Sequence, residues 1–253
     1  MLWIIGHILA VSIGLSLGLI GGGGSVLAAP ALIYIMGVPT KTALAMTLVI
    51  VGVASLIGVI PHWMQKNVNF QTVTFFAPPA MLGAYLGARI AAFPFVTSTI
   101  QLVAFALMML IASISMIRKD ARTAKPQLNA TSQHKFRGLA IALEGLGVGI
   151  ITGFVGIGGG FLVIPALVLL GKTSMKEAVG TSLVILALKS VTGFIGYLDQ
   201  VTINWNLLFS FTIAASAGIL IGAYLTRFVP AKNLEKGFGY FVLAVAIFIL
   251  IQR

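Results

Sequence analysis

Apolar residues along this chain fall into blocks that polar or glycine-rich stretches separate. The blocks cover about residues 3–20, 26–36, 42–60, 70–92 and 98–118, and then 138–155, 161–171, 178–197, 205–228 and 237–251. Strict alternation of apolar and polar positions is missing, so the blocks predict helices rather than strands. Most are long enough to span or nearly span a hydrocarbon layer of about 30 Å at about 1.5 Å per residue. We therefore expect an all-α polytopic membrane protein.

Two of the blocks, 26–36 and 161–171, are too short to cross. At about 1.5 Å per residue they reach only about half of the bilayer. Each follows a glycine run, and glycine runs break helices. The runs are Gly21-Gly22-Gly23-Gly24-Ser25 and Gly156-Ile157-Gly158-Gly159-Gly160. The pattern predicts a broken helix and a following half-helix at each run.

The second half of the chain repeats the first. A shift of 135 positions carries Pro30 onto Pro165 and superposes five glycines of the first half on five of the second: Gly14, Gly18, Gly21, Gly23 and Gly24 on Gly149, Gly153, Gly156, Gly158 and Gly159. Shared glycine and proline spacing is more specific than scattered matches of Leu or Ala between apolar helices. We predict two homologous five-segment repeats, residues 1–118 and 138–253, joined by a linker over residues 119–137.

The linker is strongly basic. Its charged residues are Lys119, Asp120, Arg122, Lys125, Lys135 and Arg137. Because Lys and Arg gather in cytoplasmic loops, we expect the linker in the cytoplasm. Basic residues also exchange between equivalent loops: the loop before the fifth block has none in the first half but Arg227, Lys232 and Lys236 in the second. Such exchange indicates an inverted repeat with both termini outside.

Composition excludes a water-soluble protein, because 59% of residues are hydrophobic and only 8% are charged, against roughly 25% charged in an ordinary soluble domain. The formal net charge of +11 lies mainly between the apolar blocks, so orientation in the membrane explains it better than nucleic-acid binding. The absence of cysteine excludes disulfides and thiolate metal sites. We expect no cofactor or metal, and we interpret residues 1–20 as a retained helix rather than a signal peptide.

The glycine runs are the strongest candidates for a binding site. Broken backbone at membrane depth is tolerated only where it is buried in protein or lines an aqueous cavity. The start of a half-helix offers free N–H groups and a positive dipole end, which suit an anion, and glycine lets a ligand approach the backbone. The alternative is that these glycines only permit tight helix crossing. A nucleotide site is excluded, because no strand precedes the runs and no P-loop lysine follows them.

Four other glycine pairs predict packing faces, where small residues let helix backbones approach closely. They are Gly14-x3-Gly18, Gly83-x3-Gly87, Gly149-x3-Gly153 and Gly218-x3-Gly222.

Two ionisable residues, Glu144 and Lys189, lie inside apolar blocks. A charge at the centre of a membrane helix costs about 3 kcal/mol or more, so such residues face a cavity or a partner. Lys189 either neutralises an anionic substrate or pairs with Glu144. Glu144 either carries a proton for coupling or belongs to a structural ion pair.

Hydroxyl residues gather on the third block of each half. They are Thr47 and Ser55 in the first half, and Thr181, Ser182, Ser190 and Thr192 in the second. For any one of these hydroxyls, a hydrogen bond to the carbonyl one helical turn earlier is as good an explanation as a role in a binding site. The pattern Ser174-x-x-Glu177 predicts a helix cap, which makes Glu177 structural. His62, beside Trp63, is expected to be an interfacial anchor.

Two stretches, GLIGGGGSVLAAPALIYIMGVPTKTALAMT and GFVGIGGGFLVIPALVLLGKTSMKEAVGTS, are each followed by a Gly-x3-Gly-Ala helix. As a pair they resemble the sulfite exporter TauE/SafE family of membrane permeases, over nearly the whole chain. The resemblance implies an inner-membrane transporter of bacteria or archaea for sulfite, sulfoacetate or organosulfonates, driven by protons. Ser25 replaces the last glycine of the first run and Met46 stands opposite Thr181, so the two half-sites are chemically unequal.

The residues and the resemblance together predict secondary transport of a small anion by alternating access, in a monomer or homodimer. The expected binding residues are Gly21, Gly22, Gly23, Gly24, Ser25, Thr47, Gly156, Gly158, Gly159, Gly160, Thr181, Ser182 and Lys189, with Glu144 as the candidate for proton coupling. A passive anion channel of the same architecture is the alternative. An enzyme is not expected, because no catalytic dyad, metal-ligand cluster or pair of catalytic carboxylates is evident.

Overall fold

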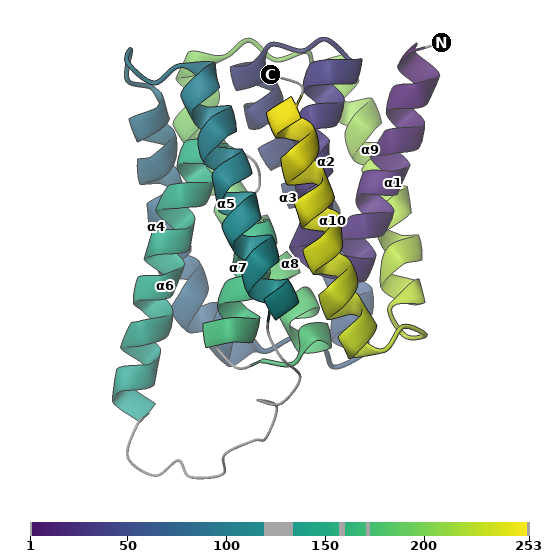
Figure 1. The fold of residues 1–253 in the computed structure, drawn as a ribbon, viewed down its shortest axis with the longest axis vertical. Coiled ribbons are helices and arrows are strands. Elements are labelled where there is room, and N and C mark those ends of the chain that lie inside the picture. The colour runs from purple at the N-terminus through teal and green to yellow at the C-terminus, as the bar shows by residue number, and fades with distance from the viewer. Residues whose placement is uncertain (1, 119–133, 157–159, 171–172, 252–253) are drawn as a thin grey trace.

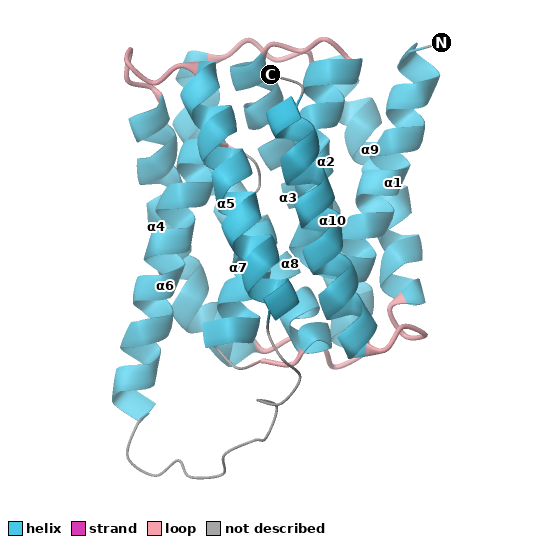
Figure 2. Cartoon of the chain, in the orientation of Figure 1, coloured by secondary structure: helices cyan, strands magenta, loops and turns pink. Residues whose placement is uncertain are grey.

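The computed structural model describes residues 2–118, 134–156, 160–170 and 173–251, and in this part of the chain helices are joined by loops and turns (Figure 2). Within these ranges, seven helices are long and apolar enough to cross a membrane. The predicted all-α polytopic architecture is confirmed.

The helices follow the predicted blocks closely. The first half contains α1 (Leu2–Ile20), the 3-10 turn η1 (Gly21–Gly24), α2 (Ser25–Pro30), the π-helix η2 (Ala31–Ile35), α3 (Thr40–Met64), α4 (Phe70–Ala91) and α5 (Ser98–Arg118). The second contains α6 (His134–Val155), α7 (Gly160–Pro165), the π-helix η4 (Ala166–Leu170), α8 (Met175–Tyr197), the 3-10 turn η5 (Leu198–Gln200), α9 (Trp205–Leu225) and α10 (Ala231–Ile251).

Both predicted half-helices are present, as α2 with η2 and as α7 with η4. Each changes from α- to π-helix directly after a proline, Pro30 or Pro165. Proline has no N–H to donate to the carbonyl four residues earlier, so the regular α pattern is interrupted there.

The two termini lie on the same face of the helix bundle, which we call the terminal face (Figure 1). The end of α5 and the start of α6 lie on the opposite face, which we call the linker face (Figure 1). Short connections then fix the direction of the other helices, so that α3 ends at the linker face and α8 ends at the terminal face. Most of the basic linker, residues 119–133, lies outside the described residues.

The two halves interlock rather than forming separate units. Helix α1 packs along α9, and α4 packs along α6. Glycines make both contacts possible: a Cβ on Gly218 would lie 2.0 Å from the carbonyl oxygen of Val11, and a Cβ on Gly87 would lie 2.1 Å from that of Ile150. The predicted packing role of the Gly-x3-Gly pairs is confirmed.

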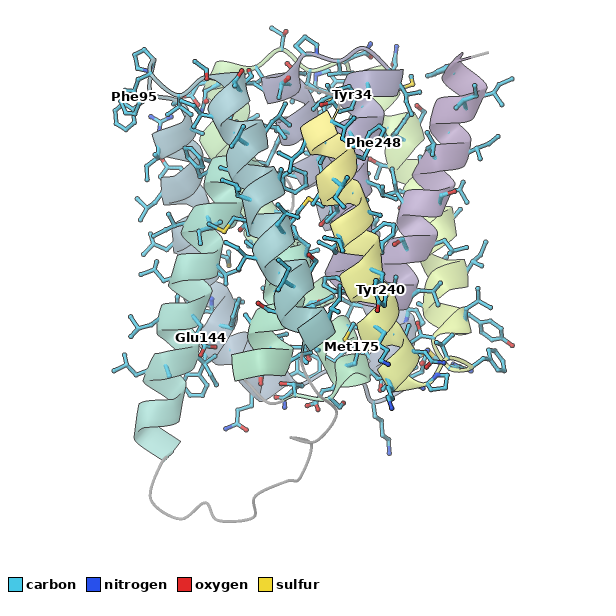
Figure 3. All side chains as sticks on the ribbon, viewed as in Figure 1. Tyr34, Phe95, Glu144, Met175, Tyr240 and Phe248 are labelled. Carbon is cyan, nitrogen blue, oxygen red and sulfur yellow. The ribbon has the colours of Figure 1, made fainter. Side chains whose placement is uncertain are left out.

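The third helices, α3 and α8, pack against each other at the centre of the bundle. They approach closely at Gly52, where a Cβ would lie 2.8 Å from the Cβ of Ser190. The buried core continues from this pair onto the half-helices and α5, as at Phe105 and Phe161, whose rings meet edge to face. At the terminal face, Tyr34 of η2 meets Phe248 of α10 in the same way (Figure 3).

Two repeat-equivalent asparagines cap α4 and α9. The side chain of Asn69 accepts from the backbone N–H of Thr72 at 2.9 Å, and that of Asn204 accepts from Leu207 at 3.1 Å. Asn69 alone also donates through Nδ2 to Glu177 Oε1, at 2.7 Å. The predicted Ser174 cap on the backbone N–H of Glu177 is confirmed, and Glu177 is structural.

Replacing Asn69 by Ala is expected to destabilise the fold more than replacing Asn204 by Ala. Both lose a helix cap, at about 1 kcal/mol, but only Asn69→Ala also leaves a carboxylate without its donor, at about 1.5–3 kcal/mol. Thermal unfolding in detergent measures the difference. Equal losses in melting temperature would contradict the extra role of Asn69.

Candidate functional site

Both predicted helix breaks occur at the first glycine of their run. Gly21 follows the end of α1 with a φ of 66°, and Gly156 follows the end of α6 with a φ of 74°. This left-handed conformation ends helices and is strained for residues with a Cβ, so glycine is required at both places. Ile157, Gly158 and Gly159 lie outside the described residues.

The two breaks touch each other in the interior of the protein. A Cβ on Gly22 would lie 1.9 Å from the carbonyl carbon of Gly160, and a Cβ on Gly160 would lie 2.3 Å from the Cα of Gly22. Both glycines are buried. The broken helices of the two halves therefore cross backbone to backbone, and in this conformation no anion fits between Gly22 and Gly160.

Hydroxyl side chains from α3 and α8 flank the breaks. A Cβ on Gly21 would lie 2.8 Å from Ser182 Oγ, and a Cβ on Gly156 would lie 2.8 Å from the Cβ of Leu44, one turn before Thr47. Thr47 and Ser182, two of the predicted site hydroxyls, thus lie on the faces of α3 and α8 that contact the breaks.

In this conformation these hydroxyls, and that of Ser25, donate hydrogen bonds to backbone carbonyl groups. Thr47 donates to the carbonyl of Ala43 and Ser182 to that of Val179, both at 2.8 Å. Ser25 donates to the carbonyl of Gly22 at 2.6 Å. These are the local hydrogen bonds that compete with a ligand.

Lys189 is buried between α8 and α6, with a relative exposure of 2%. Its Nζ donates to Thr152 Oγ1 at 3.0 Å. Among the described residues the ion pair is Arg89–Asp199, so Lys189 and Glu144 do not form the pair that was the alternative to a substrate role. Glu144 is half-buried, on the part of α6 nearer the linker face (Figure 3).

Thr181 is held by structural contacts away from the breaks. Its Oγ1 accepts from the backbone N–H of Asn69 at 2.9 Å, and next to it Gly180 packs against the carbonyl of Asn67. The loop between α3 and α4 therefore rests on this part of α8. The Thr181 hydroxyl therefore contacts this loop, whereas the Ser182 hydroxyl lies next to Gly21.

Ser55 on α3 and Ser190 on α8 are two buried hydroxyl residues whose side chains remain available. They are repeat-equivalent, 0% and 2% exposed, and their hydroxyls have no hydrogen-bond partner among the described residues. A buried hydroxyl without a partner is costly. These two are therefore added to the candidate ligand groups.

His62 and Tyr197 are functional candidates that local sequence patterns did not identify. The expectation that His62 is an interfacial anchor is wrong, because its exposure is 0% and its Nε2 donates to the carbonyl of Gly18 at 3.0 Å. Its neighbour Trp63 is 61% exposed, so the histidine occupies the inward face of α3. The shift of 135 positions between the halves could have identified both residues, since it places His62 on Tyr197, another buried aromatic hydrogen-bond donor.

Two apolar grooves open on the outer surface, away from the breaks. One is lined by Trp3, Ile4, His7, Ile8, Val11 and Ala214, and the other by Pro78, Pro79, Leu82, Ala142, Leu143 and Leu146. They follow the α1–α9 and α4–α6 contacts and offer no charged side chain to an anion.

Comparison with known proteins gives the family. The model of the sulfite exporter TauE/SafE family matches residues 7–249. The chain belongs to this family. It is 32% identical over 245 residues to a probable membrane transporter protein of Xylella fastidiosa (strain Temecula1), a match that covers 94% of this chain and 91% of the relative. The probable membrane transporter protein YdhB of Bacillus subtilis is 25% identical over 224 residues, with 88% and 90% covered.

A probable membrane transporter protein of Haemophilus influenzae is 28% identical over 254 residues, with 91% of each chain covered. No solved structure gives a significant match. Membership of this TauE/SafE family and the seven apolar helices identify the chain as a multi-pass membrane transporter, which points away from an enzyme.

Proposed function

We propose that this family member is a secondary transporter that moves a small sulfur-containing anion, of the sulfite, sulfoacetate or organosulfonate class, by alternating access. One observation carries the proposal: two broken helices, one from each half, meet at Gly22 and Gly160 inside a membrane-spanning bundle. Paired broken helices near the middle of the bilayer are the usual place of a substrate site in secondary transporters.

Admission of an anion requires the two breaks to separate. The separated backbone offers N–H groups at the start of α2 and α7, and Ser182 and Thr47 lie alongside. Ser55 and Ser190 supply hydroxyl donors that no other described residue uses. Lys189 supplies the positive charge from α8.

The same proposal includes the orientation in the membrane. The basic linker lies in the cytoplasm, the two termini lie outside, and the membrane is the inner (plasma) membrane. The halves are an inverted duplication, which the placement of the termini opposite the ends of α5 and α6 supports (Figure 1).

Glu144 is the proposed carrier of the coupling proton. It is half-buried in a membrane helix and takes no part in an ion pair of the described residues. An unpaired negative charge is costly in this setting, because little water is present to solvate it. A carboxyl group placed here is therefore suited to take up and release a proton.

Flux measurements in liposomes test the function. We expect saturable uptake of labelled sulfite or sulfonate that an imposed pH gradient accelerates. Glu144→Gln is expected to lose the acceleration but keep downhill exchange, whereas the matched control Glu177→Gln keeps both. Anion currents that follow voltage alone, without saturation, would instead identify a channel.

A further inference from the structure

The helices that end at the two breaks have their last carbonyl groups held by other helices. The last four carbonyls of a helix lack partners within it. At the end of α1, the Gly18 carbonyl accepts from His62 Nε2 and from Thr226 Oγ1, both at 3.0 Å. We call His62, Thr226 and this carbonyl the His62 latch.

The end of α6 is held in the same way. Tyr197 donates its hydroxyl to the carbonyls of Gly153 and Phe154, at 3.0 and 3.1 Å. Gln101 Nε2 donates to the Phe154 carbonyl at 2.8 Å and to the Tyr197 hydroxyl at 3.1 Å. We call Tyr197, Gln101 and these two carbonyls the Tyr197 latch.

The two latches are equivalent in the repeat but lie toward opposite faces. The shift of 135 positions that relates the halves carries His62 onto Tyr197 and Gly18 onto Gly153. His62 is near the linker-face end of α3, and Tyr197 ends α8 at the terminal face. His62, Thr226, Tyr197 and Gln101 are all 0% exposed.

Each latch lies between a buried serine and one face of the bundle. Seven residues separate Ser55 from His62 and Ser190 from Tyr197, which is two helical turns, or about 10.5 Å along the same side of the helix. Both serine hydroxyls are buried and have no partner in the part of the chain that the structure describes. The order from the centre outward is therefore serine, latch, face, on α3 and on α8 alike.

We propose that the two latches are the gates of the transport pathway, the His62 latch toward the linker face and the Tyr197 latch toward the terminal face. The proposal rests on the alternating access proposed above. Breaking a latch frees the last turn of α1 or α6, which is joined directly to Gly21 or Gly156, so the break can then move away from its partner. Both latches are closed in this structure.

Thiol labelling from either side tests the gates, because the chain has no cysteine of its own. Ser190→Cys and Ser55→Cys are the reporters, and neither change removes a hydrogen bond. Tyr197→Phe, which deletes only the hydroxyl, is expected to raise labelling of Ser190→Cys from the terminal face by about tenfold, the effect of losing a buried hydrogen bond or two. His62→Phe is expected to do the same for Ser55→Cys from the linker face.

Matched controls separate gating from general loosening. Tyr224→Phe removes a hydroxyl from an exposed tyrosine, and Thr212→Val removes one that bonds only within α9; neither is expected to change labelling. If His62→Phe does not fold, Thr226→Val weakens the same latch through its other donor, and Gln101→Met does so for the Tyr197 latch. Unchanged labelling in both latch variants, or increased labelling from the same face in both, would overturn the proposal.

The labelling result does not depend on the substrate. Side-specific labelling in a protein that moves no sulfur anion would leave the gates in place and reject the proposed substrate. Saturable flux without side-specific labelling would reject the gates and leave the transport function in place.

Discussion

Replacing Gly22 by Ala is expected to disrupt the closed conformation severely. The new Cβ would lie 1.9 to 2.2 Å from three backbone atoms of Gly160. Overpacking costs about 1–3 kcal/mol where side chains can move aside. Here the atoms that the new Cβ would contact belong to the backbone of Gly160, so relief requires the two helix breaks to move apart. We expect the variant to melt well below the wild type in detergent, or to be recovered unfolded.

Gly147→Ala is the matched control. Gly147 lies within α6, and a Cβ there would meet nothing within 4 Å. Because Ala favours helix over Gly by about 1 kcal/mol, this variant is expected to melt at or above the wild-type temperature. A Gly22→Ala protein that melts like Gly147→Ala would mean that the two breaks are not in contact in the membrane.

The sequence predicted the elements of this fold well, because each element has a local signal. The length of the apolar blocks gave the long helices, as with residues 98–118 and α5. The glycine runs predicted the breaks, since glycine adopts the left-handed backbone conformation found at Gly21 and Gly156 at the lowest cost. Small-residue spacing gave the packing faces of α1 with α9 and of α4 with α6.

Contacts between distant segments were harder to predict, because no local pattern encodes them. Lys189 was correctly interpreted as a residue that needs a partner, but the partner is Thr152 rather than Glu144. His62 was assigned to the membrane interface from its neighbour Trp63, whereas His62 is buried and Trp63 is exposed, on different sides of α3. Only the comparison of the two halves, residue by residue, links His62 to Tyr197.

Replacing Lys189 by Met is expected to weaken anion binding and transport strongly without destabilising the protein. Met preserves the length and apolar stem of the side chain but removes the positive charge. A charge-assisted contact contributes about 1.5–3 kcal/mol, so the anion is expected to bind roughly tenfold to a hundredfold more weakly. Flux and binding of labelled sulfite or sulfonate measure this loss.

The stability of the same variant distinguishes a substrate role from a structural one. Among the described residues Lys189 has one hydrogen-bond partner, Thr152, and its relative exposure is 2%. Burying a lysine at the centre of a membrane helix costs about 3 kcal/mol, so a lysine kept only for structure would need stronger compensation than this contact gives. Lys189→Met should therefore melt at or above the wild-type temperature, and Thr152→Val, which removes the acceptor but keeps the charge, should retain anion binding. A Lys189→Met protein that unfolds readily, or one that binds the anion normally, would assign the lysine to the helix contact between α6 and α8 instead.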